Sequence, residues 1–539
     1  MGDNFQLPSP APAQAQEPQQ NPTPQNATLL QAFEWYTPPD HAHFLRLSSQ
    51  IPQLSQHGIS SLWIPPSCRA TSPQSNGYDI YDLYDLGEFD QKGSVATKWG
   101  TKAQLLELAR KGKEYGVGLY WDAVLNHRFG ADHRERCKAV EVDANDRRVR
   151  VSGEYEIDAW VGFDFPGRGD QESTMKYHWY HFSGVDFNAD DPGKAGTIYQ
   201  ILGEQSQGWA KSPEDVDGEK GNYDYLMGCD VDYSHPEVVD DVLNWGRWLA
   251  KEVSIKGIRF DAVKHFSESF LKKFVKMLDG EFGEGWFLVG EFWKDSLQSM
   301  TDYLDRMDHK FSLFDAPLVY NFGEISTSVS ADLRKVFDDT LVQKAPVCAT
   351  LVQNHDTQPL QALHVPITPW FLPLGYALIL IREAGYPCIF YGDLYGLCTP
   401  TSDNPSPTRP TSGPVTIIPK LLLARKLYAY GPQTDYFDYP TCIGWVRHGT
   451  WDKKDKCAVV MSNAGEGWKW MFVGVECAGQ QWTDVLEWRK EVVTIGENGW
   501  AEFRCGGCSV SVWVWEGAKG RDEFETQFDF DIYAASTAK

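Results

Sequence analysis

Short apolar segments alternate with segments of helical periodicity along much of this chain, and this alternation restricts the fold more than any other feature. Residues 29–36, 59–64 and 118–122 predict buried strands, and the apolar spacing of residues 43–58 and 105–115 predicts helices between them. Strands joined in this way by crossover helices form a parallel sheet. The first part of the chain is therefore expected to belong to the α/β class.

The alternation stops after His127 and resumes near residue 236. The intervening residues 128–233 are polar and aromatic, rich in glycine and aspartate, and hold no long helix. A segment of that length is not a loop in a compact fold, so we expect a small inserted domain. Beyond it, helices are predicted at 236–252, 268–278 and 374–384, and strands at 257–261, 286–291, 347–351 and 387–391.

The two ends of the chain have different patterns. From about residue 428, short alternating strands predict an all-β domain, and the acidic residues after 522 predict a loose tail. The first residues are mostly proline, glutamine and alanine, so they are expected to be disordered. The expected divisions are a disordered tail at 1–27, a strand-and-helix unit at 28–127 and 234–425, an inserted domain at 128–233, a β-sandwich domain at 426–516 and an acidic tail at 517–539.

Composition disfavours several classes of partner. The formal net charge of −24 disfavours binding to nucleic acid or to an anionic membrane surface, and no uninterrupted apolar run is long enough to span a bilayer. The first residues hold no basic segment followed by an apolar one, so we expect no secretory signal and a cytoplasmic protein. The 11 cysteines are scattered and odd in number, which predicts free thiols in a reducing compartment.

Cys505 and Cys508 form a lone C-x-x-C pair with no second pair elsewhere in the chain. A lone pair of this kind is weak support for a zinc site or a redox role. We interpret the pair as the tip of a hairpin whose two central residues are glycines.

Residues 257–265 hold the most informative side chains. In the predicted strand, Arg259 and Asp261 share one face, where the guanidinium favours the ionised form of the carboxyl group. A carboxylate at the end of a strand, followed by a loop, is where barrel enzymes place catalytic groups. Taken alone, an Arg-x-Asp pair is more often a structural ion pair. The rest of the chain decides between these two interpretations.

Three further polar clusters follow predicted strands, at residues 122–127, 290–291 and 354–356. If the strands close into a barrel, all of these clusters converge on one face. Glycoside hydrolysis needs this set, because one carboxylate attacks the sugar and one carboxylic acid protonates the leaving oxygen. Asp261 suits the first role. Glu291 suits the second, since desolvation in its apolar surroundings raises its pKa.

These clusters, in this order, resemble the α-amylase family, glycoside hydrolase family 13. The resemblance runs from about residue 29 to 516 and is closest to the liquefying bacterial and intracellular fungal branch. It implies a (β/α)8 TIM barrel with a small inserted β-rich domain after the third strand and an all-β C-terminal domain. Family-like sequence outside the four clusters lies at residues 31–36, 81–89, 165–169, 176–182, 222–227 and 385–393.

The resemblance implies a role for each matching residue. Asp261 is expected to be the nucleophile, Glu291 the acid/base, and Asp356 a group that binds the distorted sugar ring and helps to stabilise the transition state. Together they imply a retaining double displacement on α-1,4-glucan or malto-oligosaccharide, through a covalent glucosyl-enzyme. Six further residues are implied to bind substrate: Tyr78, His127, Arg259, Lys264, His265 and His355.

The same resemblance and the ligand chemistry point to one calcium ion. Asn126, Asp224 and Asp230 offer hard oxygen ligands, which calcium prefers. The resemblance adds the backbone carbonyl of His265, which would link the ion to the loop of the nucleophile. Where relatives have more acids in this cluster, this chain has uncharged residues: Ser183, Pro213 and Ser234. A cluster of several ions is therefore not expected, because affinity follows the charge of the ligands.

Two residues beside the expected chemistry also depart from the family pattern. Gly290 precedes Glu291 where alanine is usual, and Gln353 precedes Asn354 where an acidic residue is common in this branch. Both lie close enough to the chemistry to alter how well water competes for the covalent intermediate.

Three functions are compatible with these residues. Hydrolysis of internal α-1,4 bonds, as in an α-amylase, is the expected one. A 4-α-glucanotransferase would use the same residues and pass the glucosyl-enzyme to a sugar acceptor, and no single residue reveals the choice of acceptor. A non-catalytic glucan-binding relative would be expected to lose carboxylates that this chain retains, or to carry a membrane segment. We expect the glucan to be the partner and the protein to be a monomer.

Overall fold

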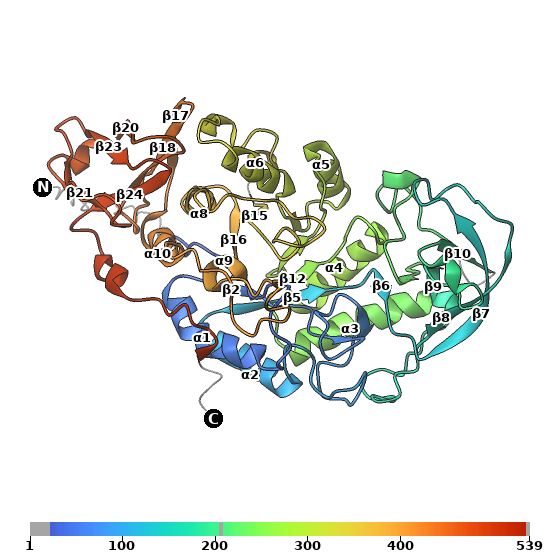
Figure 1. The fold of residues 1–539 in the computed structure, drawn as a ribbon. Coiled ribbons are helices and arrows are strands. Elements are labelled where there is room, and N and C mark those ends of the chain that lie inside the picture. Colours follow the sequence, from blue (N-terminus) through green and yellow to red (C-terminus); the bar gives the residue numbers. More distant parts are fainter. Residues whose placement is uncertain (1–21, 204–207, 346, 535–539) are drawn as a thin grey trace, which may run out of the picture.

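The computed structural model describes residues 22–203, 208–345 and 347–534 (Figure 1). Their centre is a sheet of parallel strands in the order β14-β13-β12-β5-β2-β1-β16-β15. A parallel bridge between Phe314, which follows β14, and Ala349 in β15 joins the two edges, so the sheet closes into a barrel and confirms the predicted fold. The strands are β1 Leu29–Gln31, β2 Ser61–Trp63, β5 Gly118–Ala123, β12 Gly257–Phe260, β13 Phe287–Gly290, β14 Ser312–Leu313, β15 Ala349–Leu351 and β16 Tyr386–Phe390.

Helices connect successive strands of the barrel. In α3, Val238, Val242 and Leu249 recur at the helical period and are buried. At the start of α2, Thr101 and Gln104 form a capping box that pairs otherwise unbonded backbone groups. Among the residues described, no helix is long and apolar enough to cross a membrane. The helices are α1 His43–Gln56, α2 Lys102–Glu114, α3 Pro236–Glu252, α4 Glu268–Phe282, α5 Leu297–Arg306, α6 Ala316–Ser326, α7 Leu341–Lys344, α8 Leu372–Leu380, α9 Tyr391–Tyr395 and α10 Ile418–Tyr428.

The register of the barrel strands brings the polar clusters together. Arg259 in β12 pairs with Asp122 in β5, and Phe260 pairs with Gly290 in β13. Directly paired residues of neighbouring parallel strands point to the same side of the sheet, so Arg259 and Asp122 face the same way. β1 ends at Gln31, before the predicted residue 36, because the following residues leave the sheet to form the rim of the barrel.

A second sheet, with the order β6-β11-β9-β10-β7-β8, is formed by the segment that interrupts the alternation. It extends from one side of the barrel, at the right of the view in Figure 1. Its first strand contains His127, so the inserted sheet begins directly at one of the polar clusters. The strands are β6 His127–Arg128, β7 His133–Val142, β8 Tyr155–Gly162, β9 Phe182–Val185, β10 Ile198–Leu202 and β11 Cys229–Val231, with the short pair β3 Arg69–Ala70 and β4 Ile80–Asp82 nearby in the chain.

The C-terminal part consists of a sheet with the order β17-β18-β19-β24-β21-β22 and a two-stranded ribbon, β20-β23. β23 ends at Cys505 and β24 starts at Ser509, and these two strands belong to different sheets. The prediction of a hairpin tip at Cys505 and Cys508 is therefore wrong, because the segment between these cysteines connects two different sheets. The strands are β17 Gln433–Tyr439, β18 Cys442–Arg447, β19 Cys457–Ser462, β20 Gly467–Phe472, β21 Gln481–Asp484, β22 Val493–Thr494, β23 Trp500–Cys505 and β24 Ser509–Trp515.

The described residues nearest both ends of the chain are packed or bonded where a disordered or loose tail was predicted. Residues 1–21 lie outside the described residues, but Asn26 donates through its amide to the Arg425 and Ala429 carbonyls, each at 2.9 Å. Near the other end, Ile532 is fully buried and Tyr533 is 3% exposed. The expectation of a loose acidic tail is wrong as far as residue 534, because isolated apolar side chains among the acids pack against the barrel.

Candidate active site

Arg259 is the central residue of the site. Its Nη1 lies 2.7 Å from Asp122 Oδ1 and 2.6 Å from Asp261 Oδ1, and its Nη2 lies 3.0 Å from Glu291 Oε2. The three carboxyl groups come from the carboxyl ends of β5, β12 and β13. A buried guanidinium can donate to several oxygens in a fixed plane, so this one residue sets the relative positions of three acids.

Asp122 was not among the predicted site residues. It accepts hydrogen bonds from Trp63 Nε1 and the Tyr78 hydroxyl, both at 2.9 Å, in addition to its bond with Arg259. Burial raises the pKa of Asp122 to about 6. Its position at the start of cluster 122–127 was the one indication in the sequence that Asp122 belongs to the site. Its contact with Arg259 could not be predicted, because it depends on strand register, which the sequence does not reveal.

Glu291 has the properties expected of a general acid. Burial raises its pKa to about 7, and the nearby Asp261 acts in the same direction while Arg259 opposes it. Its Oε2 accepts from Arg259 Nη2 at 3.0 Å and from the Ala262 backbone N–H at 2.9 Å. Because Oε2 already accepts two donors, the proton of the neutral form resides on Oε1.

Asp356 and His355 occupy the end of β15. Burial raises the pKa of Asp356 to about 8, with the Glu291 carboxyl as the next cause. His355 Nε2 lies 3.3 Å from Asp356 Oδ2, while the Gln31 amide lies 2.9 Å from His355 Nδ1. Burial holds the pKa of His355 well below its usual value, so the ring is neutral. An amide donor at Nδ1 leaves the ring proton on Nε2, facing Asp356.

Aromatic rings border the acids at the rim of the barrel. The Tyr78 and His355 rings are nearly parallel, with centroids 5.0 Å apart, and Trp35 is nearly parallel to both. His127 Nε2 lies 2.8 Å from the Tyr78 carbonyl oxygen, and burial lowers the pKa of this histidine. The predicted residues Tyr78, His127 and His355 therefore lie with the acids, and Trp35 is an additional aromatic residue that sequence reasoning did not single out.

Lys264 and His265 follow Asp261 in the loop after β12. Lys264 Nζ is 3.2 Å from the Trp293 carbonyl, and its charge lowers the pKa of Glu291 against the dominant effect of burial. The His265 ring is buried, with Nδ1 2.9 Å from the Tyr223 carbonyl oxygen. The structure thus directs the His265 side chain at the segment that precedes β11.

Three of the predicted calcium ligands, Asn126, Asp224 and Asp230, lie close together between the barrel and the inserted sheet. Asn126 Nδ2 lies 3.4 Å from Asp230 Oδ1, while Asn126 Oδ1 is buried and has no hydrogen-bond partner. Burial raises the pKa of Asp224 to about 7 and that of Asp230 well above its usual value, and each carboxyl group disfavours ionisation of its neighbours. An unpartnered carbonyl oxygen beside two mutually repelling carboxyl groups fits a hard cation such as calcium.

Two of the uncharged residues in this cluster form hydrogen bonds with its carboxyl groups. The Ser183 hydroxyl donates a hydrogen bond to Asp230 Oδ2, and the Ser234 hydroxyl donates one to Asp232 Oδ1 at 2.5 Å. These hydroxyl groups satisfy carboxylate oxygens that additional cations would otherwise bind. Pro213 carries no ligand atom in its side chain. The donors present therefore fit one ion rather than a cluster.

The environment of Gly290 explains one departure from the family pattern. A Cβ atom on Gly290 would lie 2.7 Å from Phe311 Cε2 and 3.1 Å from side-chain atoms of both Leu313 and Val263. Contacts under 3.0 Å force a neighbour to move. The Phe311 ring thus fills the space that an alanine methyl group would need, beside the backbone that carries Glu291.

A closed parallel barrel that gathers acids around one arginine at the carboxyl ends of its strands is typical of a barrel glycoside hydrolase. The family model described as alpha amylase, catalytic domain, matches residues 46–408. The chain therefore belongs to the α-amylase family.

Relatives align over nearly the whole chain. The chain is 44% identical to the glucan 1,4-alpha-maltohexaosidase of Bacillus sp. (strain 707), over 91% of this chain and 92% of that protein. It is 43% identical to an alpha-amylase of Bacillus licheniformis, over 91% and 93% of the two chains. It is 40% identical to the cytoplasmic alpha-amylase of Escherichia coli (strain K12), over 91% and 99%.

Solved structures share the fold. An alpha-amylase from Geobacillus thermoleovorans in complex with acarbose superposes with a TM-score of 0.61, at 16% identity, over 91% of this chain and 98% of that one. A three-domain cyclomaltodextrin glucanotransferase, CldA, gives the same TM-score and identity over 92% and 99%. At this identity, the similarity concerns the arrangement of the elements.

Proposed function

We propose that this protein hydrolyses internal α-1,4-glucosidic bonds of starch- or glycogen-type glucans and retains the configuration at the anomeric carbon. Membership of the α-amylase family and the alpha-amylases among its relatives support this reaction. The observation that carries it is the contact of one arginine, Arg259, with both Asp261 and Glu291. This shared contact keeps the two carboxyl groups close, as retaining glycosidases require.

The two steps of the proposed reaction follow from the position of the proton on Glu291. In the first step, an Asp261 carboxylate oxygen attacks the anomeric carbon, the bond from that carbon to the glycosidic oxygen breaks, and Glu291 transfers its Oε1 proton to the departing oxygen. In the second step, the Glu291 carboxylate removes a proton from water, whose oxygen attacks the anomeric carbon and releases Asp261. Arg259 contacts both groups, so it stabilises the negative charge as it moves from one to the other.

The surrounding residues suit binding of the sugar ring. We propose that Asp356, in its neutral form near pH 7, donates to a ring hydroxyl, with His355 and His127 beside it and the Tyr78 ring as a stacking surface. We propose that Lys264, whose charge lowers the pKa of Glu291, contacts the leaving-group side of the substrate. His265 is proposed to act there with it.

One calcium ion is proposed at Asn126, Asp224, Asp230 and the His265 carbonyl. When bound, the ion supplies positive charge that holds oxygen ligands of two elements together. Asn126 and His265 belong to the barrel side, and Asp230 belongs to β11 of the inserted sheet. Because these residues would bind the same ion, the ion would hold in place the loop that carries Asp261, which lies four residues before His265.

The state of the cysteines suits a reducing compartment of the cell. All eleven cysteine side chains are free thiols, and ten of them are buried. The E. coli relative is named a cytoplasmic alpha-amylase. We propose that this protein works in the cytoplasm as a monomer, kept apart from other copies by its net charge of −24.

The experiment that tests the proposed reaction is incubation with maltoheptaose, with products separated by size over time. Only shorter chains, with a steady rise in reducing ends, are expected for a hydrolase. Chains longer than the substrate, with reducing ends nearly constant, would identify a 4-α-glucanotransferase instead. No change in the presence of calcium would mean a non-catalytic glucan-binding protein.

The matched control is Glu291→Gln, which keeps the size of the side chain and removes the transferable proton. We expect turnover to fall by about 10²–10⁴-fold or more, while glucan binding and the thermal unfolding midpoint are retained. Unchanged turnover in this variant would show that another residue is the acid.

A further inference from the structure

Four of the chain's 13 histidines gather at one end of the inserted sheet. They form two groups, each with a glutamate: one group is His133, Glu135 and His178, and the other is His181, His235 and Glu237. In each group the candidate ligand atoms lie within 4.8 Å of one another. His133 and Glu135 come from β7, and His178 precedes the short helix Trp179–His181.

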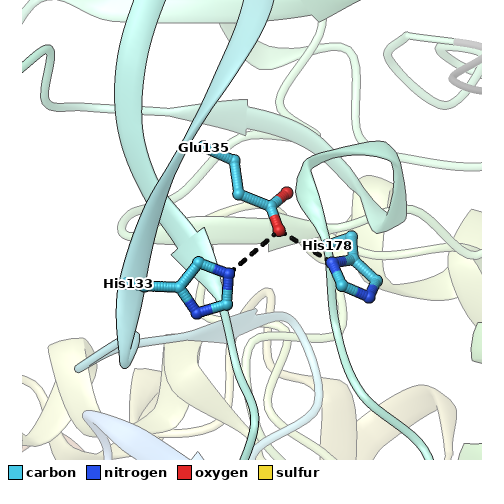
Figure 2. Close-up of side chains that lie close together, drawn as sticks. All are labelled: His133, Glu135 and His178. Carbon is cyan, nitrogen blue, oxygen red and sulfur yellow. Dashed lines mark hydrogen bonds and ion pairs between the residues drawn. The ribbon is translucent and has the colours of Figure 1, made fainter.

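The first group converges on one point, as Figure 2 shows. Glu135 Oε1 lies 2.7 Å from His178 Nδ1 and 3.2 Å from His133 Nε2. Nitrogen and oxygen ligands about 2.0–2.1 Å from a tetrahedral zinc ion lie about 3.3 Å from each other. The Glu135–His133 distance already matches this value, and the Glu135–His178 distance needs to widen by only about 0.6 Å.

In two of these side chains, the polar atom that does not face the site also has a partner in the protein. His133 Nδ1 lies 3.2 Å from Asp164 Oδ2, and Glu135 Oε2 accepts from the Trp179 backbone N–H at 2.9 Å. A carboxylate behind the second ring nitrogen is the usual support of a metal-bound histidine, because it fixes the tautomer that leaves the first nitrogen free to bind. This support is independent of the convergence of the three ligand atoms.

His133 has a carboxylate oxygen at each of its two ring nitrogens. Without a metal, His133 Nε2 is hydrogen-bonded to Glu135 Oε1 at 3.2 Å. A neutral imidazole carries one proton, so moving that proton to Nδ1, 3.2 Å from Asp164 Oδ2, would leave the lone pair of Nε2 directed at Glu135. A cation between Nε2 and Glu135 would accept that lone pair without charging the ring. The same cation accepts the lone pair of His178 Nδ1.

The second group differs because the position of its ring proton on His181 is fixed. His181 Nδ1 accepts from the His178 backbone N–H at 2.9 Å, so the ring proton is on Nε2, which donates to Glu237 Oε2 at 3.0 Å. A nitrogen that carries a proton cannot bind a metal. This group therefore provides a matched control within the same region.

We propose that His133, Glu135 and His178 bind one divalent transition-metal ion of the zinc type, with a fourth position open to solvent. Two imidazole nitrogens and a carboxylate oxygen suit zinc, in contrast to the all-oxygen ligands of the proposed calcium site. The ion would tie the start of β7 to the segment before β9. Since the ligands come together only in the folded chain, binding would stabilise the inserted sheet.

The test is a calorimetric titration of the full-length protein with zinc chloride, after removal of metals by a chelator and readdition of calcium. We expect one zinc ion per chain and a rise in the thermal unfolding midpoint. Cobalt(II) should bind at the same stoichiometry and give the visible absorption of a low-symmetry site with nitrogen ligands.

Single-residue variants test which side chains bind the zinc ion. His133→Gln and Glu135→Gln should each weaken zinc binding by at least about 100-fold, and Asp164→Asn by about 10–100-fold. His235→Gln should bind zinc as the wild type does. Circular dichroism of each variant without zinc checks that the inserted sheet is folded, and Glu135→Gln retains an oxygen that can accept from Trp179.

Two results would overturn the proposal. One is the absence of zinc binding by the wild-type protein at micromolar concentrations. The other is zinc binding that survives in His133→Gln and Glu135→Gln, or that is lost only in His235→Gln. Hydrolysis of glucan plays no part in these measurements, so they do not depend on the proposed reaction.

Discussion

At the scale of single residues, the chemistry depends on how one buried cation is shared. Arg259 contacts Asp122, Asp261 and Glu291, yet burial still raises the pKa of Asp122 to about 6 and that of Glu291 to about 7. One positive charge therefore does not neutralise all the acids around it. Burial and mutual repulsion leave a proton on Glu291 near neutral pH, where an acid catalyst needs it.

A pH dependence of activity follows from this proton. Burial raises the pKa of Glu291 to about 7, so the protonated form that donates to the leaving oxygen predominates below that pH and is lost as pH rises through it. We expect kcat/KM for maltoheptaose to fall above about pH 7, by about tenfold per pH unit at the limit. Initial rates from about pH 5 to 9 measure this, with the unfolding midpoint followed over the same range as a control. A rate that keeps rising to pH 9 would contradict the assignment.

At the scale of helices and strands, the periodicity of apolar residues was the main basis for predicting the fold. Apolar segments that end in polar clusters predicted strands and the face on which the acids meet. The sequence did not reveal that Asp122 lies beside Arg259, because that contact depends on the register of β5 and β12. It also did not reveal the group around His133, since Glu135 and His178 are brought together only by tertiary folding.

The same limit applies to the acidic tail. Phe528, Phe530 and Ile532 alternate with aspartates at the period of a strand, but this segment is short and acidic and forms no strand in the structure. Their burial depends on the barrel surface that they contact. A pattern-based prediction therefore assigned a loose tail to a segment that is packed.

The junction of β13 and β14 gives a prediction at this scale. Gly290→Ala places a methyl group 2.7 Å from the Phe311 ring, which must shift or push back the strand that carries Glu291. We expect a loss of about 1–3 kcal/mol in the free energy of unfolding, measured by urea denaturation. Phe311→Leu in the same chain should restore part of this loss by making room. Equal stability of Gly290→Ala and the wild type would mean that the ring moves without cost.

At the scale of the whole molecule, segments far apart in the chain are fastened to the barrel. The tail is one of them: Ile532 is fully buried, and the Tyr533 hydroxyl lies 3.4 Å from that of Tyr391 at the start of α9. Asn26, near the other end, bonds to the backbone that follows α10. Both ends of the described chain thus help to hold the barrel and the C-terminal sheets.

Removal of the buried tail contact should reduce stability. We expect Ile532→Ala to cost about 2–5 kcal/mol in the free energy of unfolding, because it leaves a cavity in a packed contact. Glu525→Ala, an exposed site in the same tail, is the control and should stay within about 0.5 kcal/mol of the wild type. Urea denaturation measures both. Equal effects of the two substitutions would mean that the tail adds little to the stability of the barrel.

The proposed calcium site links the barrel to the inserted sheet, so its effect belongs to this scale as well. Asn126 Oδ1 is buried without a partner, while its amide nitrogen Nδ2 lies 3.4 Å from Asp230 Oδ1 of β11. Without a cation the carboxyl groups repel one another, and the two parts lose a shared attachment. Calcium at 100 times its Kd should add about 2.7 kcal/mol to the free energy of unfolding, and a chelator should remove it. In Asp230→Asn, the rise of the thermal unfolding midpoint on adding calcium should shrink, whereas Asp164→Asn, away from this site, should keep the full rise. A midpoint that does not respond to calcium in the wild type would mean that Asn126 and its neighbours hold no ion, and that the inserted sheet is attached by protein contacts alone.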